Sequence, residues 1–185
     1  MEVLKFEGPY VCGEKGSRLN RDITATEGVY LWCIRCDNGV YRVYYVGESL
    51  NLRARLLAER LEFYDALWSV YDIERLKSND KKLVYCPGKD VEPDYALRGT
   101  KYEHSLDLKN ALSIFVAPAK TPGTGLSMKE HLERIEAALV IHLINCGKNI
   151  LHVSKINPVN VGLDELSIRS NDKKIENLTD LTIRF

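Results

Sequence analysis

Apolar and polar positions divide the chain into strand-like and helix-like segments. The segments GVYLWCI at 28–34 and VYRVYYV at 40–46 are rich in β-branched and aromatic residues, and Asp37-Asn38-Gly39 separates them. Asn-Gly supplies the positive φ angles of a tight primed turn. The two segments therefore predict a β-hairpin.

A helix is predicted directly after the hairpin. Gly47 ends the second strand, Ser49 is a suitable helix cap, and segment 50–61 carries Leu52, Leu56 and Leu57 on one side. Residues 62–78 have the spacing of a second amphipathic helix, and residues 83–86 are typical of a short strand.

The second half of the chain is predicted to contain a loop, a buried strand and a capped helix. Residues 87–107 are charged and interrupted by Pro93 and Gly99, which predicts a long surface loop, and ALSIFVAP at 111–118 predicts a buried strand. Ser127 and Glu130 form a capping box in the sequence. Apolar residues then recur at helical spacing until Gly147, at Leu132, Ile135, Leu139 and Leu143.

These segments predict an α/β fold with a small mixed or antiparallel three-stranded central sheet, made of the β-hairpin and one later strand and flanked by helices. We expect one domain over 27–150, with an insertion at about 61–110. Residues 1–26 show little periodicity and are expected to be an irregular lead-in. Residues 151–185 are expected to form a C-terminal extension that adds an edge strand or packs across the same domain.

Composition limits the partners. The 26 basic and 26 acidic residues cancel, so a nucleic-acid site must be a local patch rather than a generally basic surface. The chain shows no run resembling a membrane span or a signal peptide, and we expect a cytoplasmic protein with reduced cysteines. The Cys33–Cys36 pair lacks the second ligand pair of a structural zinc site.

The hairpin and the helix after it bring phosphate-binding chemistry together. Tyr30 and Tyr45 lie on neighbouring predicted strands, so both phenols can reach one site. Arg55 follows on the helix, with Asn51 and Glu59 at i, i+4 spacing on its face. A planar guanidinium beside two phenols suits a phosphate group.

A carboxylate in the later helix points to a cation. Glu136 stands among apolar residues, where its charge is costly unless something such as a metal ion compensates. Glu133 is the alternative ligand if the helix is rotated. Asn149 follows Gly147, where its amide can hold a loop against the site.

Two tripeptides carry a family resemblance. Gly28-Val29-Tyr30, and Tyr45-Val46-Gly47 followed by ESLNLRARL, resemble the hallmark motifs of the GIY-YIG nuclease superfamily. The order of two tyrosines, arginine, glutamate and asparagine is also that of the family, over roughly 27–60 and 111–150. The resemblance implies a metal-dependent endonuclease that hydrolyses phosphodiester bonds in DNA, with Mg²⁺ or Mn²⁺ as its cofactor.

The resemblance also implies a role for each residue. Tyr30 would orient or deprotonate the attacking water, Tyr45 would place the phosphate, and Arg55 would neutralise its developing charge. Glu136 would hold the metal and Asn149 would support the geometry. Between the second tyrosine and the helix we expect further substrate contacts, from Gly47, Ser49, Asn51 and Arg53.

One departure from the family leaves alternatives open. Many members have a histidine one helical turn beyond the arginine, where this chain has Glu59. A non-catalytic nucleic-acid-binding module of the same fold, or an interaction domain with a chance likeness, are the competing interpretations. As an enzyme, the protein would act on DNA, as a possible homodimer, in restriction, phage or mobile-element biology.

Overall fold

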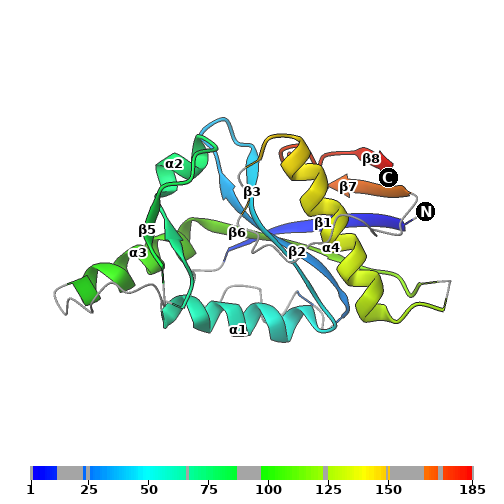
Figure 1. Ribbon diagram of the computed structural model, residues 1–185, viewed down its shortest axis with the longest axis horizontal. Helices are drawn as coiled ribbons and strands as arrows, with labels where there is room; N and C mark the ends of the chain where they lie inside the picture. The colour runs from blue at the N-terminus through cyan, green and yellow to red at the C-terminus, as the bar shows by residue number, and fades with distance from the viewer. Residues whose placement is uncertain are drawn as a thin grey trace.

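The computed structural model describes residues 2–11, 23, 26–65, 67–86, 97–122, 125–148, 150, 165–170 and 173–184. Within these residues the chain forms a six-stranded mixed sheet, a separate two-stranded sheet and four helices. The large sheet curls, and helices lie against both of its faces (Figure 1).

The predicted hairpin forms one edge of the large sheet. Strand β2 (Gly28–Arg35) pairs antiparallel with β3 (Tyr41–Ser49) on one side and with β6 (Leu112–Pro118) on the other. The turn differs in detail from the primed turn predicted, because within it only Gly39 has a positive φ, 77°. A type I turn closed by a left-handed glycine is the next most common hairpin connection.

The prediction of a three-stranded central sheet is wrong. The sheet has the order β3-β2-β6-β1-β7-β8, and its additional strands come from the segments before 27 and after 150. They are β1 (Glu2–Val11), β7 (Glu165–Ser170) and β8 (Leu181–Arg184). Strand β1 lies between β6, to which it is antiparallel, and β7, to which it is parallel.

Alternation explains why these strands escape a search for apolar runs. In β1, Leu4 and Phe6 are buried, whereas Lys5 and Glu7 are exposed. A strand with one face in the core has a polar residue at every second position. The segment 2–11 therefore reads as polar and irregular although Leu4 and Phe6 enter the core.

Helices cover the two faces of the sheet with different residues of the same strand. Val29 and Leu31 of β2 belong to the core beneath α4 (Met128–Asn145), and Tyr30 and Trp32 belong to the core beneath α1 (Leu52–Tyr64). Burial on both faces accounts for the continuous apolar composition of β2.

The insertion folds differently from its prediction. Residues 62–78 are not one helix but the end of α1, strand β4 (Val70–Tyr71) and the short helix α2 (Ile73–Lys77). Strand β5 (Leu83–Tyr85) forms as predicted and pairs with β4. Helix α3 (Leu97–Ala111) occupies most of the expected loop.

Aromatic packing explains the break after α1. The Trp68 ring stacks on Phe63 at 5.0 Å between centroids, and its indole donates to Glu62 Oε2 at 2.7 Å. These contacts turn the chain back onto α1, so tertiary packing overrides the helical spacing.

The capped helix begins where predicted. The Ser127 hydroxyl accepts from the Glu130 amide at 3.2 Å, and Glu130 Oε2 accepts from the Ser127 amide at 3.0 Å. The four predicted apolar positions of α4 are buried, which places Glu136 at the border of the buried face.

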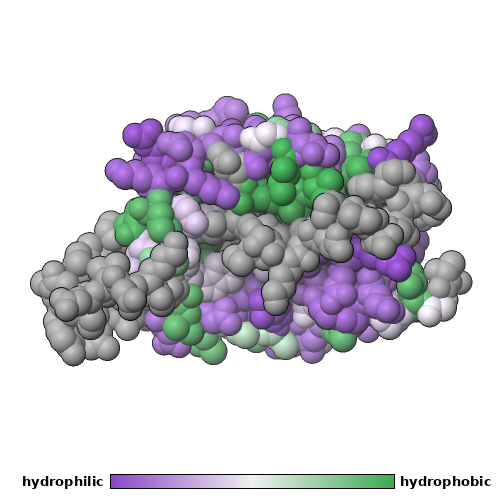
Figure 2. Space-filling view, viewed as in Figure 1, coloured by the Kyte–Doolittle hydropathy of each residue, from purple (hydrophilic) through white to green (hydrophobic). Residues whose placement is uncertain are grey.

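Among the residues coloured in Figure 2, hydrophilic ones border an apolar area at upper centre, and smaller apolar areas lie at the left and along the lower edge. Among the residues that the structure describes, no helix is both long enough and apolar enough to cross a membrane.

Candidate active site

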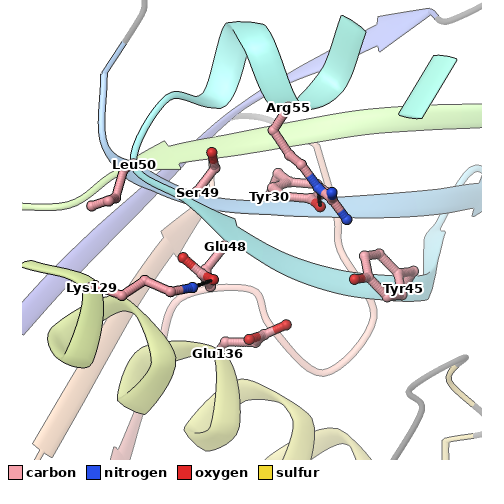
Figure 3. Close-up of a pocket in the computed structure, with 8 residues that line it drawn as sticks. All are labelled: Tyr30, Tyr45, Glu48, Ser49, Leu50, Arg55, Lys129 and Glu136. Carbon is pink, nitrogen blue, oxygen red and sulfur yellow. Dashed lines mark hydrogen bonds and ion pairs between the residues drawn. The ribbon is translucent and has the colours of Figure 1, made fainter. Parts of the chain in front are cut away.

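A pocket opens at the edge strand β3. Its lining residues come from strands β2 and β3, the turn before α1, and helices α1 and α4. It has a volume of about 380 Å³ and is lined by Tyr30, Tyr45, Glu48, Ser49, Leu50, Arg55, Lys129 and Glu136. Figure 3 shows Arg55 and Tyr30 on one side of the β3 ribbon and Lys129 and Glu136 on the other. The structure therefore brings together the four side chains predicted to converge: Tyr30, Tyr45, Arg55 and Glu136.

A β-bulge directs Tyr45 into this pocket. Trp32 lies opposite Tyr45 and Cys33 lies opposite Val43, so Tyr44 is an extra residue in β3. A bulge lets two successive side chains lie on one face of a strand. Tyr44 and Tyr45 consequently both pack on the α1 side.

The motif glycines make room for close approaches. Gly47 lies directly opposite Tyr30 on the neighbouring strand, and a Cβ atom at Gly47 would overlap the Tyr30 ring. At Gly28 a Cβ atom would overlap the carbonyl oxygen of Ala117. Position 47 must therefore be glycine for the Tyr30 ring to lie against β3.

Tyr30 is fully buried and its hydroxyl is engaged on two sides. It donates a hydrogen bond to Glu59 Oε1, and it accepts one from Arg55 Nε at 3.2 Å. Burial, followed by the charge of Glu59, raises the pKa of Tyr30 far above its usual value. The phenol is therefore protonated.

Glu59 is a buried carboxylate at the centre of this network. Besides Tyr30, it accepts a hydrogen bond from Trp32 Nε1 at 2.8 Å and forms an ion pair with Arg55 Nε at 3.0 Å. Burial raises the pKa of Glu59, while the three donors, Tyr30 first, act against that shift. The i, i+4 pair of Arg55 and Glu59 thus lies half in the core, since the Glu59 side chain is 0% exposed and that of Arg55 is 41% exposed.

Tyr45 is the more accessible phenol. Its ring meets Trp68 edge-on at 5.2 Å between centroids and lies 6.1 Å from the Tyr30 ring. Burial, followed by the charges of Glu59 and Glu136, raises the pKa of Tyr45 to about 12. Tyr45 is therefore a hydrogen-bond donor at neutral pH.

Two carboxylates form the opposite wall. Glu48 Oε1 is paired with Lys129, and Glu48 Oε2 is buried without a hydrogen-bond partner among the described residues. Burial, followed by the nearby Glu48, raises the pKa of Glu136 from its ordinary value of 4.5 to about 7. This wall therefore attracts positive charge.

The donor set fits a hard divalent cation. The described residues contain no cluster of three or more His, Cys, Asp or Glu side chains that could enclose a metal. Mg²⁺, however, is commonly held by one or two carboxylates together with waters and substrate phosphates. Glu136 and Glu48, which line the pocket, are the two carboxylates that could take this role. Glu133 is exposed, lies 3.5 Å from the Lys129 ammonium and does not line the pocket.

The other predicted site residues have mixed positions. Ser49 lines the pocket, and Gly47 lies beneath Tyr30. Asn51 is the N-cap of α1, accepting from the Ala54 amide at 3.0 Å, so it takes the capping role predicted for Ser49. Arg53 is exposed and does not line the pocket. Asn149 lies outside the described residues.

Several pocket residues were missed by the sequence analysis, namely Glu48, Leu50 and Lys129. Lys129 precedes Glu136 by two helical turns, a spacing that places both on one face of α4. Glu48 directly follows the second tripeptide. Both signals were present in the sequence, but neither carries meaning until β3 and α4 are known to be neighbours.

Comparison of the chain with protein-family models, with curated proteins and with solved structures finds no match. An assignment of this pocket therefore depends on its own geometry and chemistry.

Proposed function

We propose that the protein is a metal-dependent endonuclease of the GIY-YIG type that hydrolyses phosphodiester bonds in DNA. The observation that carries the proposal is the pocket itself, in which two phenols and a guanidinium face a wall of carboxylates across β3. Phosphodiester hydrolysis needs a positioned water, positive charge at the non-bridging oxygens and help for the leaving oxygen.

Arg55 and Tyr45 bind the phosphate in this proposal. The half-exposed guanidinium offers planar donors toward the pocket. Tyr45 is protonated at neutral pH because its pKa is about 12, so its hydroxyl donates to a second phosphate oxygen. The pair sets the orientation of the phosphorus toward the carboxylate wall.

Glu136, with Glu48 beside it, would hold Mg²⁺ or Mn²⁺. The bound cation would supply positive charge next to the phosphate as negative charge develops on its oxygens. Lys129, which pairs with Glu48, provides part of that charge from the protein itself.

Tyr30 positions the attacking water. Arg55 Nε lies against the Tyr30 hydroxyl at 3.2 Å, so a guanidinium drawn toward a phosphate exposes the phenol to the pocket. Binding of the substrate and access of water to Tyr30 are thereby coupled.

The test is cleavage by the purified protein of supercoiled, branched and single-stranded DNA, and of RNA, with and without Mg²⁺. Wild-type protein is expected to cleave DNA only with the cation, and Glu136→Gln to lose this activity. Glu133→Gln is the matched control, because Glu133 lies on the same helix outside the pocket, and it should cleave normally. Absence of cleavage of every substrate by folded wild-type protein contradicts the proposal.

The complete burial of Tyr30 favours a second candidate, a non-catalytic nucleic-acid-binding module of the same fold. Such a module would retain DNA without cutting it and would keep its affinity in Glu136→Gln. The same samples, measured for binding and for cleavage, separate the two functions.

A further inference from the structure

The buried network behind the pocket contains a carboxylate that does not line the pocket. Glu59 is 0% exposed, and both of its oxygens receive donors from neighbouring strand β2. A charged carboxylate loses favourable hydration when it is buried and needs hydrogen bonds in return. Here those bonds fix its orientation toward one particular hydroxyl, that of Tyr30.

We propose that Glu59 is the positioning residue and proton acceptor that acts through Tyr30, so that the phenol relays a proton from the attacking water to the buried carboxylate. This inference rests on the endonuclease function proposed above and assigns the base in that reaction. Trp32 holds Oε2 of Glu59, which leaves Oε1 aligned with the Tyr30 hydroxyl.

The relay follows from the protonation of the phenol. A neutral phenol has no strong basicity, and burial beside Glu59 keeps Tyr30 neutral. It takes a proton on its oxygen only if its own proton leaves at the same time. Glu59 Oε1 already accepts that proton in a hydrogen bond.

The step is balanced. The water oxygen forms a bond to phosphorus, and one phosphorus–oxygen ester bond breaks with its electron pair remaining on the leaving oxygen. The water proton passes to the Tyr30 oxygen, and the original Tyr30 proton passes to Glu59. The leaving oxygen takes a proton from solvent water, and Glu59 returns its proton to solvent after the product departs.

Arg55 links this relay to substrate binding. In the structure its Nε lies 3.0 Å from Glu59 Oε1 and 3.2 Å from the Tyr30 oxygen. An opposite charge stabilises the carboxylate form. When a phosphate attracts the guanidinium, this stabilisation weakens, and Glu59 gains affinity for a proton at the moment the reaction needs an acceptor.

The closing experiment is a double-mutant cycle on the single-turnover cleavage rate with Mg²⁺. Glu59→Gln and Tyr30→Phe are each expected to slow cleavage by roughly 10²–10⁴-fold, with DNA affinity in Ca²⁺ close to that of wild type. Because the two groups act in one relay, the double variant should be no slower than the slower single variant. The inference is overturned if the loss of rate in the double variant equals the product of the two single losses. It is also overturned if Glu59→Gln cleaves at the wild-type rate.

Further variants separate chemistry from folding. Asp65→Asn is the control, since Asp65 is an exposed carboxylate at the end of the same helix and does not line the pocket, and it should cleave like wild type. Glu59→His, which restores a proton acceptor, should cleave at least about tenfold faster than Glu59→Gln. It also serves as the second test if thermal melts show that Glu59→Gln does not fold.

The outcomes distinguish the two proposals. If wild-type protein cleaves no substrate, the endonuclease function fails and the relay fails with it. If wild-type protein cleaves and the glutamine and histidine variants are equally slow, only the relay fails, because a purely structural role of Glu59 then suffices.

Discussion

The Arg55 guanidinium contacts buried groups and is also partly exposed to solvent. Its Nε contacts Tyr30 and Glu59, while the side chain is 41% exposed at the pocket. A lysine carries the same charge but not the fork of donors. We therefore predict that Arg55→Lys keeps most DNA affinity and loses cleavage by about 10²-fold or more.

Binding and single-turnover cleavage of the same DNA check this prediction. Arg60→Lys provides the control, because Arg60 lies on the same helix and does not line the pocket. Near-normal cleavage by Arg55→Lys would show that charge alone suffices at this position.

Glu136 links the pocket to stability. Its pKa is about 7 in the folded protein, against an ordinary value of 4.5. Between these values the folded protein binds more protons than the unfolded chain, so this side chain makes the free energy of unfolding fall as pH rises. Without added metal, Glu136→Gln should be more stable than wild type by about 1–3 kcal/mol above pH ~7.

Denaturant melts in chelator at pH ~4.5 and pH ~8 measure this difference. The stabilisation should be absent at the lower pH and should shrink when Mg²⁺ is added, because the cation binds only the charged form. Equal stability of the two proteins at pH ~8 would contradict the raised pKa.

Individual site residues were predictable to different degrees. Tyr30, Tyr45 and Arg55 could be placed together because the hairpin and the following helix are local structures with strong signals. Glu136 could be predicted because a carboxylate in an apolar stripe is unusual. The burial of Glu59 could not, since in the sequence an i, i+4 pair with Arg55 is indistinguishable from an ordinary surface pair.

Strand β3 depends on its glycine for the geometry of the site. A methyl group at Gly47 would overlap the Tyr30 ring, which is confined by the α1 core. We predict that Gly47→Ala destabilises the fold by about 1–3 kcal/mol and reduces cleavage, because the phenol must move away from Glu59.

Gly39→Ala is the comparison for this substitution. Gly39 has nothing within 4 Å of a Cβ position, but its φ of 77° disfavours alanine, so it should lose about 1 kcal/mol without a change in cleavage. If Gly47→Ala proved as mild as Gly39→Ala in both measurements, the contact with Tyr30 would be unimportant.

Strand β1 contributes to the core although its sequence looks irregular. Phe6 is fully buried in the core on the α4 side of the sheet. We predict that Phe6→Ala costs about 3–5 kcal/mol in the free energy of unfolding, whereas Lys5→Ala on the exposed face changes it by about 0.5 kcal/mol or less. A small effect at Phe6 would argue against the six-stranded sheet.

The predicted strands are β2, β3, β5 and β6, and of these β2 and β6 have apolar residues on both faces. Strands β1 and β7 have one apolar face of two residues each, Leu4 and Phe6 in β1 and Leu166 and Ile168 in β7. Alternation over so few positions occurs often by chance. The partners of β1, strands β6 and β7, also lie far away in the sequence, so local spacing contains no sign of that pairing.

The composition of the pocket has a consequence for the products expected of the proposed endonuclease. The described residues form this site from a single chain, with one Arg55 and one Glu136, so a monomer is expected to cut one strand of a duplex. With supercoiled DNA we predict that a nicked circle accumulates before linear DNA. Cutting of both strands in one event requires two copies, for which a symmetric dimer is the common arrangement.

Time courses of cleavage at several protein concentrations, beside sedimentation of the protein, test this expectation. Formation of linear DNA should depend more steeply on protein concentration than nicking does. Linear product that forms without a nicked intermediate, from protein that sediments as a monomer, would contradict it.

The position of β1 in the middle of the sheet also governs the order in which the chain can fold on the ribosome. Both neighbours of β1 come more than a hundred residues later, β6 at Leu112–Pro118 and β7 at Glu165–Ser170. During synthesis the hairpin β2–β3 and helix α1 can form first, while β1 still lacks both strands with which it pairs. Pairing between strands so distant in the sequence slows folding and prolongs the exposure of apolar surface. Newly made chains should therefore depend on chaperones until the last strands emerge, even though the hairpin β2–β3 is complete much earlier.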